Sequence, residues 1–241
     1  MTRWAACATL IGLIGLTGAA AALAGAFQIS PVRVNLTTQA PIAVLTVHNG
    51  GAEAGVMQLS LMAWSQAEEQ DNYLATQEVL VTPPIFTLAP GADQIVRVAL
   101  RRKPDATREL SYRLFLQEVP AAATEAREVR VALRFGIPVF VGPDARPAAS
   151  VLDWRVTAAP QGALRIEARN RGNTHLQLTG FSVAAADGTI LARHQGMDYL
   201  LPEQARHWSL VPETAAPPGA RLDIVAQTDA GKLHAEAPLE P

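Results

Sequence analysis

The chain has 241 residues, of which 49% are apolar and 17% charged, so it can bury a packed core and lacks the composition of a disordered protein. Its 20 Lys and Arg residues against 22 Asp and Glu residues give a formal net charge of −2, which argues against the basic surface of a nucleic-acid-binding protein. Aromatic residues make up 5% of the chain, too few for a base-stacking platform.

Residues 1–26 have the pattern of a secretory signal peptide. One charged residue, Arg3, precedes an apolar run that closes with the small residues Ala24-Gly25-Ala26. We expect cleavage after Ala26, with Ala24 as the alternative; a retained anchor is the competing interpretation. Because the single cysteine, Cys7, lies in this segment, the exported chain is expected to have no disulfide and no thiol ligand. Nothing after it predicts membrane insertion.

The next hundred residues show short runs of alternating apolar and polar residues at intervals of about ten. Turn sequences such as Asn49-Gly50-Gly51, Pro83-Pro84 and Pro90-Gly91 separate them, a pattern typical of antiparallel sandwiches. The predicted strands are Ile42–His48, Val56–Trp64, Ile95–Leu100, Tyr112–Val119 and Val129–Val141.

A cluster of proline and glycine at residues 142–147 predicts a linker, which we place at residues 144–150. The strand pattern then restarts. The sequence therefore predicts an all-β protein with one domain at residues 27–143, a second at residues 151–241, and about seven strands in each. Strands of the second domain are predicted at Val151–Val156, Ala163–Ala168, His175–Val183, Thr189–Ala192, Arg206–Val211, Arg221–Gln227 and Lys232–Ala235.

Catalytic motifs are absent from the sequence. It contains no phosphate-binding loop, no zinc-protease motif and no nucleophile elbow. The five histidines are scattered and are expected at the surface, and Glu68, Glu69 and Asp71 are expected at a solvated hairpin tip. We therefore expect no enzyme activity, no metal site and no cofactor.

The predicted strand Val129–Val141 has an apolar residue at every second position over thirteen residues, well beyond the usual strand length. Two interpretations remain open at this point. Its apolar face is buried in the domain's own core, or its first half is an exposed edge that pairs with another protein.

Several segments together resemble the periplasmic pilus-assembly chaperones of the PapD-like family. Val81–Val98 (VTPPIFTLAPGADQIVRV) has the family's Pro-Pro, Leu, Pro-Gly and strand-borne Arg. Ile29–Leu36 resembles the first strand, Arg108–Pro120 the sixth and Val129–Val141 the seventh, while Leu164–Phe181 resembles a strand and turn of the second domain. The resemblance covers nearly the whole exported chain and is strongest over residues 29–143.

The resemblance implies two immunoglobulin-like β-sandwich domains joined at an angle with a cleft between them. It also implies a chaperone in the periplasm that binds pilin or fimbrial subunits and delivers them to an outer-membrane usher, without a nucleotide. In this family the seventh strand lends alternate apolar side chains to an incomplete subunit. Here the donors would be Val129, Val131, Leu133 and Phe135, whose burial contributes about 6–12 kcal/mol before association costs. Self-association of the free chaperone is left open.

Basic residues in the family's cleft bind the terminal carboxylate of the subunit. Arg33 matches the one in the first strand, and its guanidinium suits a bidentate contact. The second is usually a lysine in the seventh strand, and that position here is Pro138, which carries neither charge nor N–H. Either Arg33 acts alone or a neighbour such as Arg134 substitutes; Arg101 and Arg102 are further candidates.

Two features concern the relation between the domains and the subgroup. Many family members have an arginine at the position of Gly142, and this arginine belongs to an ion network between the domains. Glu109 matches the acidic member of that network and is therefore expected to lack its partner here. We expect apolar contacts to hold the domains together instead. The ending IPVFV resembles chaperones of spore-coat-U or archaic pili. A fibre subunit or a hydrolytic or carbohydrate-binding sandwich is the alternative, but the chain shows no disulfide, no N-terminal donor extension and no cluster of carboxylates or aromatics.

Overall fold

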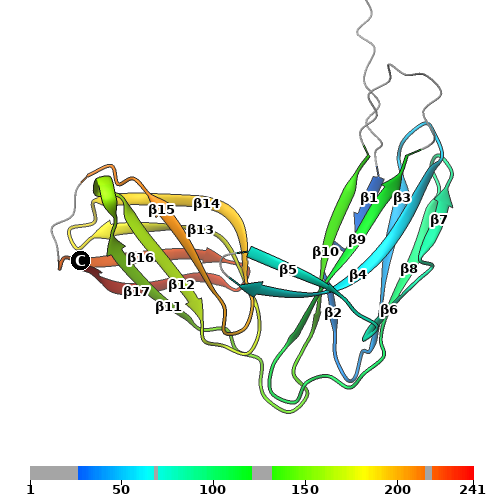
Figure 1. Ribbon diagram of the computed structural model, residues 1–241, viewed down its shortest axis with the longest axis horizontal. Coiled ribbons are helices and arrows are strands. Elements are labelled where there is room, and N and C mark those ends of the chain that lie inside the picture. The colour runs from blue at the N-terminus through cyan, green and yellow to red at the C-terminus, as the bar shows by residue number, and fades with distance from the viewer. Residues whose placement is uncertain (1–26, 68–69, 121–131, 215–218) are drawn as a thin grey trace, which may run out of the picture.

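The computed structural model describes residues 27–67, 70–120, 132–214 and 219–241. Within these residues the protein consists of β-strands and contains no α-helix, only one 3₁₀ turn at Pro160–Gly162. The strands form two β-sandwich domains, β1 to β10 in one and β11 to β17 in the other, set side by side and linked by the chain between β10 and β11 (Figure 1). The predicted all-β, two-domain fold is confirmed.

The first domain contains two sheets packed face to face. One has the strand order β1-β3-β8-β6; the other has the order β2-β10-β9-β4-β5, with β7 also paired to β4. Alternate side chains of both sheets fill the core, including Leu45, Val96 and Leu114, because successive strand residues point to opposite faces. The strands are β1 (Phe27–Ser30), β2 (Val34–Leu36), β3 (Ile42–Asn49), β4 (Gly55–Ala67), β5 (Gln70–Ala75), β6 (Val79–Thr82), β7 (Ile85–Leu88), β8 (Asp93–Leu100), β9 (Leu110–Val119) and β10 (Arg134–Val141).

The N-terminal segment of this domain passes from one sheet to the other. β1 pairs antiparallel with β3, and three residues later β2 pairs parallel with β10, with Val34 opposite Val139 and Leu36 opposite Val141. The edges of the two sheets therefore meet where Arg33 lies, on the same side of the domain as β10.

The second domain has seven strands in the order β14-β13-β16-β17-β11-β12-β15. The antiparallel group β14-β13-β16-β17 joins the group β11-β12-β15 through a short parallel contact between β11 and β17, and side chains from both groups form one core. The strands are β11 (Leu152–Ala158), β12 (Leu164–Asn170), β13 (Leu176–Ala185), β14 (Ile190–Leu200), β15 (Ala205–Leu210), β16 (Arg221–Thr228) and β17 (Gly231–Glu240).

The described strands match the predicted ones closely, with differences at particular elements. The first domain has ten strands instead of about seven, because the N-terminal segment is split into β1 and β2 and because β5 to β7 were not anticipated. Only the second part of the long predicted strand, Arg134–Val141, is described as β10; Val129 and Val131 lie outside the described residues.

Candidate functional site

One backbone edge of β10 is unpaired over its first half. β9 pairs antiparallel with β10 along its whole length, whereas β2 pairs only with its last three residues. Leu133 accepts a hydrogen bond from the Glu118 N–H (2.8 Å), and Gly142 donates to the Leu36 carbonyl (3.0 Å). Because backbone groups alternate sides along a strand, Arg134 and Gly136 direct theirs away from β9, where the described part of the chain supplies no partner strand.

The apolar face of β10 changes from half-buried to fully buried along the strand. Leu133 and Phe135 are half-buried and pack against the rim of the core, while Ile137, Val139 and Val141 are at most 5% exposed. The core interpretation therefore describes the end of the strand, and the exposed-edge interpretation fits its beginning. Of the four predicted donors, the structure places these two at the unpaired edge; the other two fall among the undescribed residues.

Pro138 lies where the unpaired edge meets β2. The alternation of backbone groups places its nitrogen on the side away from β9, so the missing N–H leaves the β9–β10 ladder intact. Extending the parallel register of β2 by one residue places Arg33 beside Pro138. The unpaired edge therefore ends against Arg33.

The Arg33 side chain reaches from the first domain to the second. Its Nη1 donates to Asp229 Oδ2 (2.6 Å) and lies 3.3 Å from His175 Nε2. The side chain is 32% exposed, so part of it is accessible to solvent where the two domains meet. Arg33 thus combines an accessible position at the end of the edge with a carboxylate that already occupies one of its nitrogens.

The structure does not bring Arg134 beside Arg33. Arg134 is exposed, and its guanidinium lies over the Phe115 ring at 4.0 Å. Arg33 lies beside Pro138, four residues further along β10 than Arg134, which is about 13 Å at the rise of a strand. In this arrangement the Arg134 guanidinium faces Phe115, and no contact among the described residues joins it to Arg33. The further candidate Arg102 is paired with Glu78.

Sequence reasoning missed Arg113, which lies in β9 directly opposite Pro138. Its Nε and Nη1 are buried without a hydrogen-bond acceptor in the described chain. The guanidinium carbon lies 4.7 Å from the centroid of the Trp64 ring and 5.9 Å from that of Tyr199. A charged residue inside the apolar strand Tyr112–Val119 was the available signal, but alternation alone could not show that it lacks an acidic partner.

A polar contact between Glu109 and His175 joins the two domains, and it shows that the expectations for both residues were wrong. Glu109 has a partner: His175 donates its backbone N–H to Glu109 Oε1 (3.0 Å), and its ring Nδ1 lies 2.8 Å from the same oxygen. His175 was expected at the surface, but its side chain is 11% exposed and stacks on Phe140 with ring centroids 3.5 Å apart. This pair connects the two domains, so Glu109 has a partner although position 142 is a glycine.

Apolar contacts also hold the domains together, as expected. Trp64 and Phe140 of the first domain are buried with Leu201 of the second, and Tyr73 and Tyr199 pack around them. Gln66 adds two interdomain hydrogen bonds through its amide, donating to the Tyr199 carbonyl (2.8 Å) and accepting from the Leu201 N–H (3.0 Å). A cluster of mainly aromatic side chains is therefore at the centre of the described contacts between the domains.

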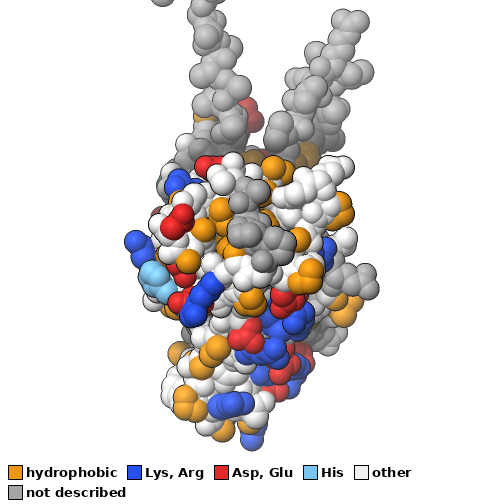
Figure 2. Space-filling model, turned by 90° about the vertical axis from the view of Figure 1, so that its left-hand side faces the viewer, with side chains coloured by type: hydrophobic (Ala, Val, Ile, Leu, Met, Phe, Trp, Pro, Cys, Tyr) orange, Lys and Arg blue, Asp and Glu red, His pale blue; other side chains and the backbone are white. Residues whose placement is uncertain are grey.

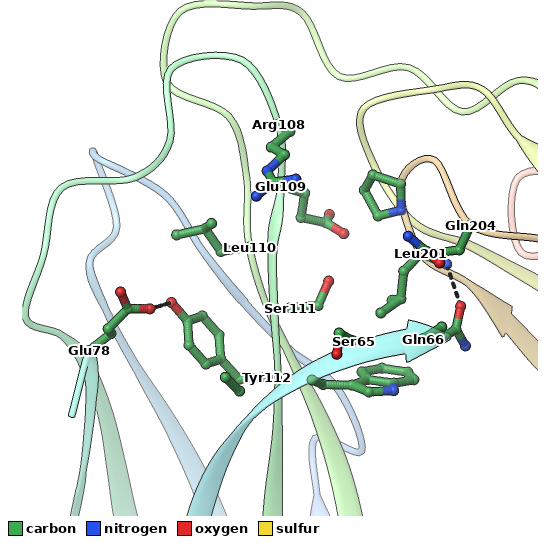
Figure 3. A pocket seen from close by; sticks show the side chains of 13 residues that line it. Ser65, Gln66, Glu78, Arg108, Glu109, Leu110, Ser111, Tyr112, Leu201 and Gln204 are labelled. Carbon is green, nitrogen blue, oxygen red and sulfur yellow. Dashed lines mark hydrogen bonds between the residues drawn. The ribbon is translucent and has the colours of Figure 1, made fainter. Parts of the chain in front are cut away.

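A cleft of about 200 Å³ lies near the end of β4, between β9 and the segment 201–204 (Figure 3). On its first-domain side, the Tyr112 hydroxyl donates to Glu78 Oε2 (2.7 Å), and Arg102 pairs with the other carboxylate oxygen. The hydrogen bond from Tyr112, aided by Arg102, lowers the pKa of Glu78, whereas burial is the main cause that raises the pKa of Tyr112. This ion pair and hydrogen bond stabilise the β5–β6 turn.

The described residues show neither a metal site nor a membrane-spanning helix. No group of three or more His, Cys, Asp and Glu side chains is placed to hold a metal ion there. Nor does this part of the chain contain a helix of sufficient length and apolarity to cross a membrane. Acidic and basic side chains are interspersed on the face that the second domain presents in Figure 2, without a large area of one sign.

The known proteins that are similar to this chain include several chaperones. The curated Chaperone protein PapD of Escherichia coli is 33% identical over 113 residues, which are 44% of this chain and 46% of PapD, so the match spans about half the length of that relative. A chain in the CsuC–CsuE chaperone–tip adhesion subunit pre-assembly complex of the archaic Csu pili of Acinetobacter baumannii has a TM-score of 0.67 at 20% identity, over 88% of this chain and 97% of that one. The E. coli chaperone DraB has a TM-score of 0.60 at 19% identity, over 90% and 97%.

The sequence profile of the pili and flagellar-assembly chaperones, PapD N-terminal domain, matches residues 26–147, slightly more than half of the chain. That segment contains the unpaired edge of β10, Arg33 and Arg113, and the solved structures of similar fold extend over both domains. This chain belongs to the PapD-like family of pilus-assembly chaperones.

Proposed function

We propose that the protein is a periplasmic chaperone that binds pilin or fimbrial subunits through the unpaired edge of β10 and delivers them to an outer-membrane usher. Residues 1–26 serve as the cleaved signal, residues 27–143 as the subunit-binding domain, residues 144–150 as a linker and residues 151–241 as the second domain. The membership in the chaperone family and the complexes of similar chains with a pilin and a tip adhesion subunit support this proposal.

The observation that carries the proposal is the unpaired first half of β10. A partner strand can add to the exposed backbone groups of Arg134 and Gly136, and half-buried Leu133 and Phe135 can extend into the groove of an incomplete sandwich. An unpaired edge with apolar side chains favours aggregation unless a partner covers it. Because Leu133 and Phe135 are already half-buried, their full burial contributes less than the about 3–6 kcal/mol of two fully exposed side chains, before the costs of association.

Arg33 sets the register of the partner strand. A partner strand that runs along β10 towards the C-terminal end of β10 reaches Arg33 beside Pro138. The terminal carboxylate of the partner strand then meets the Arg33 guanidinium. An arginine–carboxylate contact is stronger than a neutral hydrogen bond and orients both groups. The IPVFV ending and the fold similarity to a chain of the archaic Csu complex favour a subunit of archaic type.

The experiment replaces Leu133 by aspartate in the exported chain. The probe is a short synthetic peptide with alternating valine and threonine, two N-terminal lysines for solubility and an amidated C-terminus, and binding is followed by calorimetry. Loss of one donor from an apolar groove costs about 1.5–3 kcal/mol, a reduction in affinity of roughly 10- to 150-fold. The control is Val44→Asp, at a 48% exposed position on the other sheet, which should bind normally.

Two results would contradict the proposal. Wild-type affinity in Leu133→Asp would show that β10 does not pair with the peptide. Unfolding of that variant in the absence of peptide, seen by circular dichroism, would show that Leu133 belongs to the domain's own core.

A further inference from the structure

His175 of the second domain contacts two charged residues of the first. Its ring Nδ1 lies 2.8 and 3.0 Å from the two carboxylate oxygens of Glu109, and its Nε2 lies 3.3 Å from Arg33 Nη1. The side chain is 11% exposed, and its ring stacks on Phe140 with the two planes 8° apart. Contacts at both nitrogens and at one face therefore fix the orientation of this imidazole.

The two polar contacts of His175 together require one protonation state of the ring. A carboxylate only accepts hydrogen bonds, so Nδ1 must carry a hydrogen in order to donate to Glu109. A guanidinium only donates, so Nε2 can accept from Arg33 only through its lone pair. The arrangement is therefore that of a neutral imidazole with its hydrogen on Nδ1.

The second domain uses both hydrogens of Arg33 Nη1. One is donated to Asp229 Oδ2 (2.6 Å), and the other is directed at His175 Nε2. Asp229 is held independently by the backbone of Gln177, which donates to Oδ1 (3.1 Å) and accepts from the Asp229 N–H (3.0 Å). Neutral His175 thus adds a second contact that keeps this nitrogen of Arg33 on the second domain.

Protonation of His175 removes that second contact and leaves the others in place. A hydrogen on Nε2 faces an N–H of Arg33, so a donor meets a donor and two positive charges adjoin. The contact with Glu109 is kept, since Nδ1 carries a hydrogen in both states. The guanidinium can turn away from the ring about its hydrogen bond to Asp229, and one N–H of Nη1 then becomes available to another acceptor.

Imidazole is the side chain whose charge ordinarily changes between about pH 5 and pH 8, whereas carboxyl groups titrate near about pH 4 and guanidiniums above about pH 12. The phenol of Tyr199, with its ring centroid 5.9 Å from that of His175, stays neutral over this range because burial raises its pKa. The charged groups around His175 come from β9, the segment before β2 and the β16–β17 turn: Glu109, Arg33, Asp229 and, over the Tyr199 ring, Arg113. Mild acid therefore acts on this cluster through His175.

We propose that His175 is a proton-dependent positioning residue for Arg33. In its neutral form it holds the guanidinium on the second domain, and in its protonated form it releases one N–H to the terminal carboxylate of the partner strand. This inference rests on the proposed function and adds a regulation of it: mild acid strengthens the hold on a partner with a free carboxylate. By linkage, binding of that carboxylate favours proton uptake by His175.

The first test compares two forms of the valine–threonine peptide, one with a free C-terminal carboxylate and one amidated, at about pH 5.5 and about pH 7.5. The ratio of the two affinities isolates the carboxylate contribution from pairing along β10. In wild type we expect the ratio to be roughly 5- to 30-fold larger at the lower pH, the effect of one charge-assisted hydrogen bond. In His175→Gln, whose amide can donate and accept but does not titrate, the ratio should change less than about twofold. The matched control is His48→Gln, which removes a histidine from an exposed pair with Asp93 and should keep the wild-type response.

The second test needs no partner. Nitrogen NMR of the free chaperone follows the ring of His175 and the guanidinium of Arg33 as the pH is lowered. We expect the Arg33 signals to shift with the midpoint of the His175 ring, and to be independent of pH in His175→Gln. A histidine with a purely structural role would leave the Arg33 signals unchanged.

The outcomes separate this inference from the proposed function. A wild-type ratio that does not change with pH, or an equal change in His175→Gln, overturns the inference, as does a His175 ring that keeps one protonation state between about pH 5 and pH 8. If His175→Gln unfolds, the wild-type NMR titration decides: Arg33 signals that follow the His175 midpoint support the inference, and constant signals overturn it. Failure of wild type to bind either peptide at either pH overturns the proposed function itself.

Discussion

Asp229 forms an ion pair with Arg33, the residue that we propose binds the terminal carboxylate of the partner strand. Its Oδ2 accepts from Arg33 Nη1, while its Oδ1 accepts from the Gln177 N–H (3.1 Å) and its own N–H donates to the Gln177 carbonyl (3.0 Å). The β16–β17 turn therefore holds this carboxylate in place independently of Arg33. We predict that Asp229→Asn increases the affinity of the chaperone for a strand with a free C-terminal carboxylate.

The magnitude follows from the exposure of the pair. The side chains of Arg33 and Asp229 are 32% and 26% exposed, so solvent screens the attraction in part. A charge-assisted hydrogen bond in such a setting contributes about 1–2 kcal/mol, between the values for exposed pairs and for hydrogen bonds to charged groups. The incoming carboxylate must compete with that energy, so removing the Asp229 charge should strengthen binding about 5- to 30-fold. Asparagine keeps the acceptor for Gln177, so the turn should persist.

The assay is calorimetric titration with the carboxylate and amidated valine–threonine peptides at moderate ionic strength. The increase should appear with the carboxylate peptide alone, and Arg33→Ala in the Asp229→Asn background should remove it. Asp153→Asn is the matched control: it removes a carboxylate from another ion pair of the second domain, with Arg171, and tests the effect of net charge alone. Unfolding of free Asp229→Asn should be easier by about 1 kcal/mol because an interdomain ion pair is lost.

The reasoning would be refuted by unchanged or weaker binding of the carboxylate peptide to Asp229→Asn. Weaker binding would mean that Asp229 orients Arg33 for the partner and does not compete with it. An equal increase in the affinity of Asp153→Asn for the carboxylate peptide would show that the effect comes from the change in net charge and not from Asp229 itself.

Further predictions concern the groups around the cleft. Tyr112→Phe should destabilise the protein by about 1 kcal/mol at neutral pH, since Glu78 loses a donor. Because the folded-state pKa of Glu78 is lowered, its stabilisation is fully present above the ordinary value of about 4.3 and is lost as pH falls through the folded value; urea unfolding of both proteins should therefore converge in acid. His175→Ala should cost about 2–3 kcal/mol, because buried Glu109 loses its partner, against less than about 1 kcal/mol for His48→Ala at an exposed pair. Equal urea midpoints for these two variants would contradict the assigned role of the Glu109–His175 contact.

The interdomain contacts give the free chaperone a preset cleft. Gln66 and Glu109 each bind backbone groups of the second domain, and the Trp64–Phe140–Leu201 cluster excludes water between these contacts. A fixed relation between the domains keeps Asp229 and His175 of the second domain at a constant distance from Arg33. Binding therefore does not require the ordering of a hinge, which reduces its entropic cost.

The strand pattern of the chain was predictable from local sequence. Alternation in Ile42–His48 or Tyr112–Val119 determines which residues face a core, because side chains alternate faces with a period of two whatever the partner strand is. The same alternation identified Val129–Val141 as unusual. It could not show where along that strand burial begins, since this depends on the point at which β2 joins the edge.

The candidate site was only partly predictable. Arg33 was named through a family resemblance, but its contacts with His175 and Asp229 join residues 142 and 196 positions apart, which no local pattern reveals. Arg134 and Arg113 are both arginines in apolar strands, and only the pairing of β9 with β10 distinguishes the one beside Pro138 from the one about 13 Å away.

The amino-acid sequence by itself predicted a pair of β-sandwiches with its single cysteine in the N-terminal segment, a long apolar strand and a proline where the family resemblance led us to expect a lysine. The tertiary structure decided which half of that strand is unpaired, which carboxylate pairs with Arg33 and which arginine has buried nitrogens without an acceptor among the described residues. The reason is physical: strand periodicity is a property of neighbouring residues, whereas burial, charge pairing and free edges depend on which distant segments come together.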